Sequence, residues 1–288
     1  MSAREYFAVR NSVATPSGRI SYVEQGDGPV ALFVHGVLLN GYLWRHQLSE
    51  LSNMRRCIAV DLLAHGHTEA AEGQDVSVTA NAHMLAQFLD ALTIDQVDLV
   101  GNDSGGGICQ IFAALYPARV RTLALTNCDC HDNWPPAAFK DFVVMVAAGG
   151  WPDTLKAMLG DKSVYRTALA PAYEHPEAIS DEEIDTYLKP LASSPKRIKE
   201  FERFVSAFDN QHTLTIESQL RQFKAPTLIA WGTDDVYFDT QWSHWLEQAI
   251  PGTRKRVEFD GARIFFPEER AAAFNSELRA HWSGAARG

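Results

Sequence analysis

The sequence predicts an α/β fold in which helices flank a mostly parallel central sheet and a helical segment is inserted late in the chain. Short apolar runs bounded by turns alternate with amphipathic stretches through the first half of the chain, a pattern typical of strands joined by crossover helices. Residues 131–223 then contain helical segments without strand-like apolar runs, and strand-like segments return only after them. The two ends of the chain are therefore expected to share one sheet.

The expected strands of the first half cover residues 30–34, 57–61, 97–101 and 121–126. Between the second and third strands, residues 79–92 have apolar side chains at helical spacing, and Thr79 is the expected N-cap. After the third strand we expect a helix over 106–116, which Pro117 ends. Beyond the insertion, the sheet is expected to resume near residue 226 and at 254–259, before a terminal helix over 267–282.

The third expected strand ends in a glycine-rich turn, where small residues flank a candidate nucleophile on both sides. Gly101 and Gly105 stand two positions before and after Asp103, the spacing of a strained nucleophile elbow between a strand and a helix. Centring the turn on Ser104 instead places Asn102 where the small residue belongs. A glycine turn without chemistry is the third interpretation.

Around this turn the chain resembles the α/β-hydrolase family, and within it the branch with an aspartate nucleophile, the haloalkane dehalogenases and epoxide hydrolases. Residues 30–37 are similar to the strand and His-Gly turn of that branch, and residues 57–67 to its next strand and glycine loop. Residues 226–235 are similar to the strand and loop that deliver the acid, which places Asp235 in that role. The resemblance implies an α/β-hydrolase core, residues 1–130 and 224–288, and a helical cap, residues 131–223. It also implies an oxyanion hole built from the backbone amides of Val37 and Ser104.

The chain departs from the family pattern at the catalytic histidine. After the last strand the family has a small residue, the histidine and an apolar run, whereas this chain has Arg263 at the corresponding place. A guanidinium stays protonated and cannot act as a general base. Arg263 could instead pair with Asp103 or Asp235 and hold Asp103 ionised, bind an anionic group of the substrate, or neutralise both carboxylates in a site that only binds.

The loop after the fourth strand offers further candidates. Asp129 lies where some members of the family place their acid, and it is an alternative to Asp235. His131 could be a relocated base if its ring turns toward Asp103, and a loop histidine without a catalytic role is the other interpretation. The cap tyrosines Tyr165, Tyr173 and Tyr187 could protonate an opening ring or could be packing residues. Expected oxyanion or substrate contacts come from Val37, Ser104, His35, Trp134 and Tyr165.

Composition narrows the classes of partner. The 288 residues carry a formal net charge of −10, which argues against nucleic acid and anionic membranes as partners. The N-terminus has no apolar signal core, so we expect a cytoplasmic protein, either monomer or homodimer, that acts on a small molecule. The four cysteines are expected as reduced thiols, and neither a metal nor a cofactor is implied.

Three classes of function follow. The first is a hydrolase that acts on a small, largely apolar substrate through an Asp103 ester, as in epoxide hydrolases. The second is a lyase, isomerase or cyclase that uses Asp103 and Arg263 on the same scaffold, and the third is a ligand-binding protein with a decayed site. A Ser104 esterase or lactonase is a variant of the first class, and it also needs a histidine partner.

Overall fold

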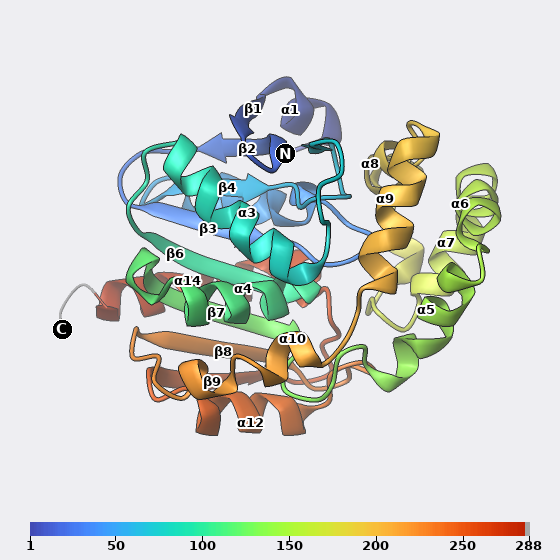
Figure 1. Cartoon of the computed structure of the whole chain (residues 1–288). Helices are drawn as coiled ribbons and strands as arrows, with labels where there is room; N and C mark the ends of the chain where they lie inside the picture. The colour runs from blue at the N-terminus through green and yellow to red at the C-terminus, as the bar shows by residue number, and fades with distance from the viewer. Residues whose placement is uncertain (286–288) are drawn as a thin grey trace.

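The central element of the computed structural model, which describes residues 1–285, is a nine-stranded mixed sheet (Figure 1). The strand order is β1-β2-β4-β3-β6-β7-β8-β9, and β5 pairs with β2. The strands are β1 (Arg10–Thr15), β2 (Gly18–Gln25), β3 (Val30–Val34), β4 (Arg56–Val60), β5 (Glu69–Ala70), β6 (Val97–Asp103), β7 (Val120–Cys128), β8 (Thr227–Gly232) and β9 (Thr253–Phe259). Pairing from β4 through β3 to β9 is parallel throughout. The predicted fold class is confirmed.

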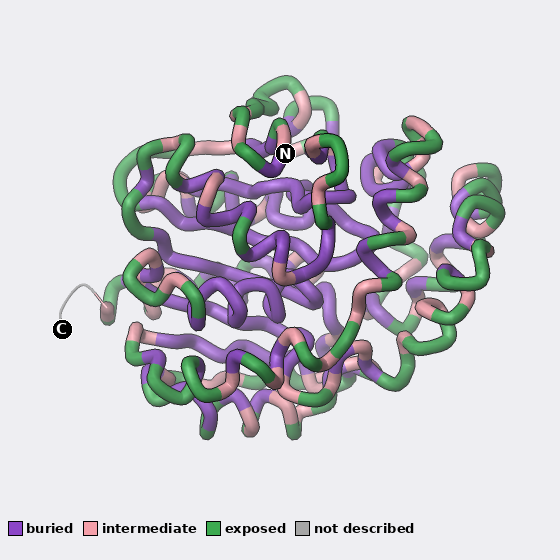
Figure 2. Tube along the Cα trace, viewed as in Figure 1, coloured by how far each residue is buried: buried purple, intermediate pink, exposed green. Residues whose placement is uncertain are grey.

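Helices cover both faces of the sheet (Figure 1). Helices α3 (Val78–Ala91) and α4 (Ser104–Leu115) lie on one face, and α2 (Arg45–Leu51) and α14 (Ala271–Ala285) pack together on the other. Every residue of β3, β6 and β8 is buried as a result, which is why these strands are mostly apolar. The polar residues of β6, Asp98, Asn102 and Asp103, are buried as well. Figure 2 shows this buried layer along the centre of the sheet.

Two sequence expectations about helix ends are corrected. Helix α3 is capped by Ser77, whose side chain accepts from the Ala80 amide, while Thr79 lies inside the helix and contacts His212 Nδ1 at 2.7 Å. The expected terminal helix is two helices, α13 (Phe266–Glu269) and α14, separated by Arg270. Helix α12 (Thr240–Ala249) connects β8 to β9.

A group of helices lies to one side of the sheet, at the right in Figure 1. It contains α5 (Lys140–Ala147), α6 (Trp151–Gly160), α7 (Lys162–Leu169), α8 (Asp181–Leu191) and α9 (Pro195–Ser206). Two short helices that follow, α10 (Gln211–Leu214) and α11 (Glu217–Leu220), pack against α4. We use the word cap for α5 to α9.

Buried arginines hold the cap to the rest of the molecule. The guanidinium of Arg197 in α9 donates to the backbone oxygens of His65, Gly66 and Thr68, at 2.9, 2.9 and 2.5 Å. Each donated bond satisfies a carbonyl that the cap would otherwise bury without a partner. The cap helices are therefore anchored at the carboxyl ends of the strands, next to the elbow.

A second anchor joins α2, α8 and α13. Arg45 Nη1 lies 2.5 Å from Glu268 Oε1, and Arg45 Nη2 lies 2.7 Å from Glu183 Oε1. Burial is close to complete for Arg45 and Glu268, whose side chains are each 8% exposed. Removing one member of such a pair leaves the other charge buried and uncompensated.

No helix within residues 1–285 has the length and apolar character needed to cross a membrane.

Candidate active site

The elbow is built at the junction of β6 and α4. Asp103 ends the strand with φ 56° and ψ −138°, and Ser104 is the first residue of the helix. A non-glycine residue in such a conformation costs about 1–3 kcal/mol and persists only where the surroundings impose it. The strained corner therefore belongs to Asp103 and not to Ser104.

Glycines allow the strands and loops around Asp103 to approach closely. A Cβ on Gly36 would lie 2.0 Å from Asp103 Oδ2, and a Cβ on Gly105 would lie 2.2 Å from the His35 carbonyl oxygen. Both distances are too short for any side chain. The close contact between the two turns therefore requires glycine on both sides, in the His-Gly turn after β3 and after Asp103.

Backbone amides hold the Asp103 carboxylate. The Val37 N–H donates to Asp103 Oδ2 at 2.9 Å, and the Ser104 N–H is a second donor. The carboxylate also lies at the N-terminus of α4, where the helix dipole favours negative charge. These are the two amides that the sequence assigns to the oxyanion hole, and they surround Asp103 itself.

Asp103 lines a small, largely apolar cavity between the core and the cap. Its volume is about 30 Å³, which is enough for about two water molecules. Leu169 and Ala172 close it from the cap side, and Val37 and Ile264 contribute from the core. Because the space is so small, a substrate larger than a few atoms requires the cap helices to shift.

Burial makes the carboxyl groups of this site hard to ionise. Desolvation raises the pKa of Asp103 to about 7, against the lowering effect of the Val37 and Ser104 amides. Desolvation also raises the pKa of Asp129 well above its ordinary value, with the charge of Asp103 as the next cause. Asp129 lines the same cavity, and its Oδ1 is buried without a hydrogen-bond partner. Two electrostatically linked carboxyls therefore face one small space.

A third buried carboxyl group, that of Asp235, lies in the loop after β8. Its Oδ1 accepts from the Tyr237 amide at 2.8 Å, and its Oδ2 is buried without a partner. Desolvation raises its pKa to about 7. Its negative charge contributes to the raised pKa of both Asp103 and Asp129. Asp235 therefore belongs to the electrostatics of the site, although the residues that line the cavity do not include it.

The structure directs Arg263 away from the cavity. Its Nη1 donates to the carbonyl oxygens of Ala170 and Tyr173, at 2.7 and 2.9 Å, in the segment that follows α7. The next two residues, Ile264 and Phe265, line the cavity with Asp103. Within residues 1–285, the hydrogen-bond partners of the Arg263 guanidinium are these cap carbonyls rather than the carboxylates of Asp103 or Asp235.

The expected histidines also lie apart from the cavity. His131 Nδ1 is 3.1 Å from Glu217 Oε2, and its ring stacks on Trp245 at 4.6 Å between centroids. His35 is completely buried, and its Nε2 accepts from the Leu62 N–H. Its Nδ1 therefore carries the proton and donates to the Gly36 carbonyl at 2.7 Å. Burial lowers the pKa of His35 to about 4, so the ring is neutral and supports the His-Gly turn.

The cap tyrosines surround Glu268 rather than Asp103. The hydroxyls of Tyr173 and Tyr187 donate to Glu268 at 3.4 and 3.3 Å. Tyr165 is fully buried next to them, and burial raises its pKa above the ordinary range. None of the three lines the cavity among the described residues. Trp134 is likewise a packing residue here, since its ring lies against Gly107 of α4 and the ring of Phe208.

Most residues that line the cavity were not identified from the sequence, and Tyr237 and Ile264 are among them. Tyr237 lines the cavity, and burial together with the charges of Asp235 and Asp103 raises its pKa to about 12. Its position two residues after Asp235 is the signal that could have identified it. Ile264 gave no such signal, because an aliphatic residue in a loop carries no chemistry of its own.

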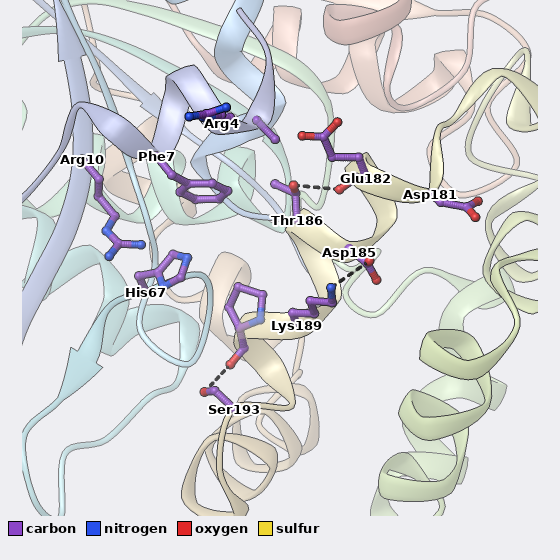
Figure 3. Close-up of a pocket in the computed structure, with 12 residues that line it drawn as sticks. Arg4, Phe7, Arg10, His67, Asp181, Glu182, Asp185, Thr186, Lys189 and Ser193 are labelled. Carbon is purple, nitrogen blue, oxygen red and sulfur yellow. Dashed lines mark hydrogen bonds and ion pairs between the residues drawn. The ribbon is translucent and has the colours of Figure 1, made fainter.

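A larger groove lies elsewhere, between α1 (Ala3–Ala8) and α8 (Figure 3). Its volume is about 680 Å³. Some of the side chains that α8 contributes are partnered within the helix: Lys189 Nζ lies 2.9 Å from Asp185 Oδ2, and Thr186 donates to the Glu182 carbonyl at 2.8 Å. The groove lies apart from the elbow, since its lining includes none of Asp103, Asp129 and Asp235.

The sheet order, the elbow and the inserted helices together define an α/β hydrolase. The chain matches the alpha/beta hydrolase fold family over residues 29–270 and belongs to it. Haloalkane dehalogenase 2 of Mycobacterium tuberculosis is 28% identical over 224 residues, which are 77% of this chain and 76% of that protein. Epoxide hydrolase 2 of Caenorhabditis elegans is 34% identical over 112 residues, 38% of this chain and 32% of that protein.

Solved structures agree on the fold. The structure of the epoxide hydrolase CorEH without ligand covers 96% of this chain and 98% of its own, with a TM-score of 0.80 and 18% sequence identity. The meta-cleavage product hydrolase CumD from Pseudomonas fluorescens covers 96% and 98%, with a TM-score of 0.76 and 20% identity. At these identities the likeness concerns the fold alone.

Proposed function

We propose that this protein is a hydrolase in which the Asp103 carboxylate attacks an electrophilic carbon of a small, largely apolar substrate and forms an aspartyl ester. One observation carries the proposal: the strained corner of the elbow is Asp103, and a backbone amide already holds its Oδ2. An amide in that position stabilises the oxyanion that forms when the ester is hydrolysed. The same amide thus supports both attack and release.

The cavity favours an epoxide-type substrate over an alkyl halide. Dehalogenases of this branch hold the leaving halide with an Asn and a Trp, and this chain has Val37 and Ser104 at those places. Tyr237 supplies a hydroxyl that stays protonated near neutral pH and can donate to a substrate oxygen. The similarity to the Caenorhabditis elegans protein named Epoxide hydrolase 2 supports the same class.

The test is turnover of a small epoxide such as 1,2-epoxybutane in H₂¹⁸O, followed by peptide mapping. Hydrolysis at the carbonyl carbon of the ester leaves ¹⁸O in the Asp103 carboxylate, so we expect the label in the peptide that contains Asp103. Asp103→Asn is expected to abolish diol formation. Asp132→Asn, the same chemical change at an exposed position, is the matched control and should retain it.

Two outcomes would contradict the proposal. Activity that survives in Asp103→Asn and disappears in Ser104→Ala would favour an esterase with Ser104 as the nucleophile. Binding of small apolar ligands without product or label would favour a non-hydrolytic enzyme or a binding protein. The alternative of a non-hydrolytic enzyme or a binding protein has its own support, because no histidine lines the cavity within residues 1–285.

A further inference from the structure

We propose that Asp129 performs the proton transfers of this site in place of a histidine: it donates a proton when the substrate ring opens and then activates the water that hydrolyses the ester. The inference rests on the proposed role of Asp103 as nucleophile. It assigns a catalytic residue and a mechanism of release to a site that lacks the base usual in this family.

The position of Asp129 carries the argument. It directly follows β7, the strand that pairs with β6, so the carboxyl ends of these two strands bring Asp129 and Asp103 to one edge of the sheet. Both side chains line the same cavity of about 30 Å³. Asp129 is 1% exposed, and its Oδ1 has no hydrogen-bond partner. A buried carboxyl oxygen without a partner is costly, and it is available to a water or substrate in that cavity.

The other titratable groups near Asp129 are less suited to the task. Asp235 contributes charge but does not line the cavity within the described residues. The thiols of Cys128 and Cys130 flank Asp129 in sequence, and burial raises the pKa of both well above the ordinary value. Tyr237 lines the cavity, but with a pKa of about 12 it cannot accept a proton near neutral pH.

The reaction balances with one proton held on Asp129 at the start. The Asp103 carboxylate attacks a ring carbon of the epoxide, the carbon–oxygen bond breaks, and Asp129 gives its proton to the alkoxide. Asp129, now a carboxylate, takes a proton from water as the hydroxide adds to the ester carbon of Asp103. The oxyanion on Oδ2 collapses, and the second alkoxide leaves and takes the proton from Asp129. Asp103 is then a carboxylic acid and gives its proton to Asp129, which restores the starting state as the diol departs.

The electrostatics of the pair change in the direction this sequence needs. While Asp103 is ionised, its charge raises the pKa of Asp129, which keeps a proton there for the first step. Esterification removes the charge of Asp103, so the pKa of Asp129 falls as it becomes the base. The covalent step itself therefore converts Asp129 from a proton donor into a base.

Two probes separate the two roles. An alkyl bromide such as 1-bromobutane alkylates a carboxylate without a proton donor, since bromide leaves unprotonated, whereas 1,2-epoxybutane needs one. In Asp129→Asn we expect the bromide to label Asp103 and the label to persist, with ester release slower by about 10²–10⁴-fold than in the unmodified protein. With the epoxide, formation of the ester should slow as well.

The readouts are the mass of the intact protein over time and the modified peptide. Asp132→Asn is the control, and Asp129→Glu, which keeps a carboxyl group, should restore part of the release rate. If the Asp129→Asn protein releases its Asp103 ester as fast as the unmodified protein does, the role of Asp129 is overturned, and Asp103 remains the nucleophile. Failure of every protein, the unmodified one included, to form the ester would overturn the role of Asp103 and this inference with it.

Discussion

Residue 264 shows how one side chain decides the chemistry that is available at the elbow. The loop after β9 places Ile264 in the cavity with Asp103 and turns Arg263 toward the cap. An isoleucine side chain can neither accept nor donate a proton. The site therefore has carboxyl groups and a phenol where its relatives use an imidazole.

Ile264→His is expected to place an imidazole in the cavity beside Asp103. In the Asp129→Asn background we expect the substitution to accelerate release of an Asp103 ester by about tenfold or more, because a histidine with a pKa near neutrality is an effective general base. The measurement is the rate at which the alkylated mass disappears. If the double variant retains the ester as long as Asp129→Asn alone, a histidine at position 264 cannot activate water for attack on the ester carbon.

Alkylation of Asp103 is expected to depend on pH near neutrality. Only the carboxylate is nucleophilic, and burial raises the pKa of Asp103 to about 7. The initial rate of labelling by an alkyl bromide should therefore rise with pH and level off above about pH 8. A rate that is already constant from about pH 5 upward would mean that Asp103 is ionised as readily as an exposed aspartate.

At the scale of elements, the molecule is a sheet-based core to which a set of helices is fastened by side chains. The buried strands were predictable because both of their faces are covered, which selects continuous apolar runs. The antiparallel strands β1 and β2 were not predicted. Strand β1 is mostly exposed, and its two half-buried residues, Val13 and Thr15, lie at alternate positions late in the strand. Its sequence carries little apolar signal. Loops such as 260–265 were beyond prediction because their side-chain directions depend on what packs against them.

Arg263→Ala is expected to loosen the cap rather than to stop the chemistry. The substitution removes the two hydrogen bonds to Ala170 and Tyr173, and a hydrogen bond from a charged donor contributes about 1.5–3 kcal/mol. We expect a lower melting temperature and a higher KM, with the pH dependence of Asp103 alkylation unchanged. A pH profile displaced to higher pH would instead show that the guanidinium stabilises the Asp103 carboxylate, as the sequence suggested.

At the scale of the whole molecule, the buried carboxyl groups of the candidate active site lower the stability of the folded state when they are ionised. Asp103, Asp129 and Asp235 are buried, and the pKa of each is raised above the unfolded value near 3.8. Between the unfolded and folded pKa values, the folded state binds more protons than the unfolded state. The contribution of these three carboxyl groups to the free energy of unfolding therefore falls as the pH rises from about 4 through about 7.

Asp129→Asn is expected to stabilise the protein at alkaline pH, because it removes a charge that is costly to bury. The gain in melting temperature over the unmodified protein should be largest near pH 8 and should shrink toward pH 4, where the carboxyl is protonated in the folded state and only partly ionised in the unfolded state. Thermal unfolding at several pH values measures it, with Asp132→Asn as the control. A gain that is greater at acidic pH would contradict the assignment of a raised pKa to Asp129.

The sequence by itself determined the fold class, the main buried strands and the elbow with Asp103 at its corner. These features follow from local rules: apolar runs that two covered faces require, and glycines that a close backbone approach requires. Only the tertiary structure decided which side chains meet Asp103. It brought Asp129 and Tyr237 to the cavity, turned Arg263 and His131 elsewhere, and gathered the cap tyrosines around Glu268, because the direction of a loop or cap side chain is set by long-range packing that no local pattern encodes.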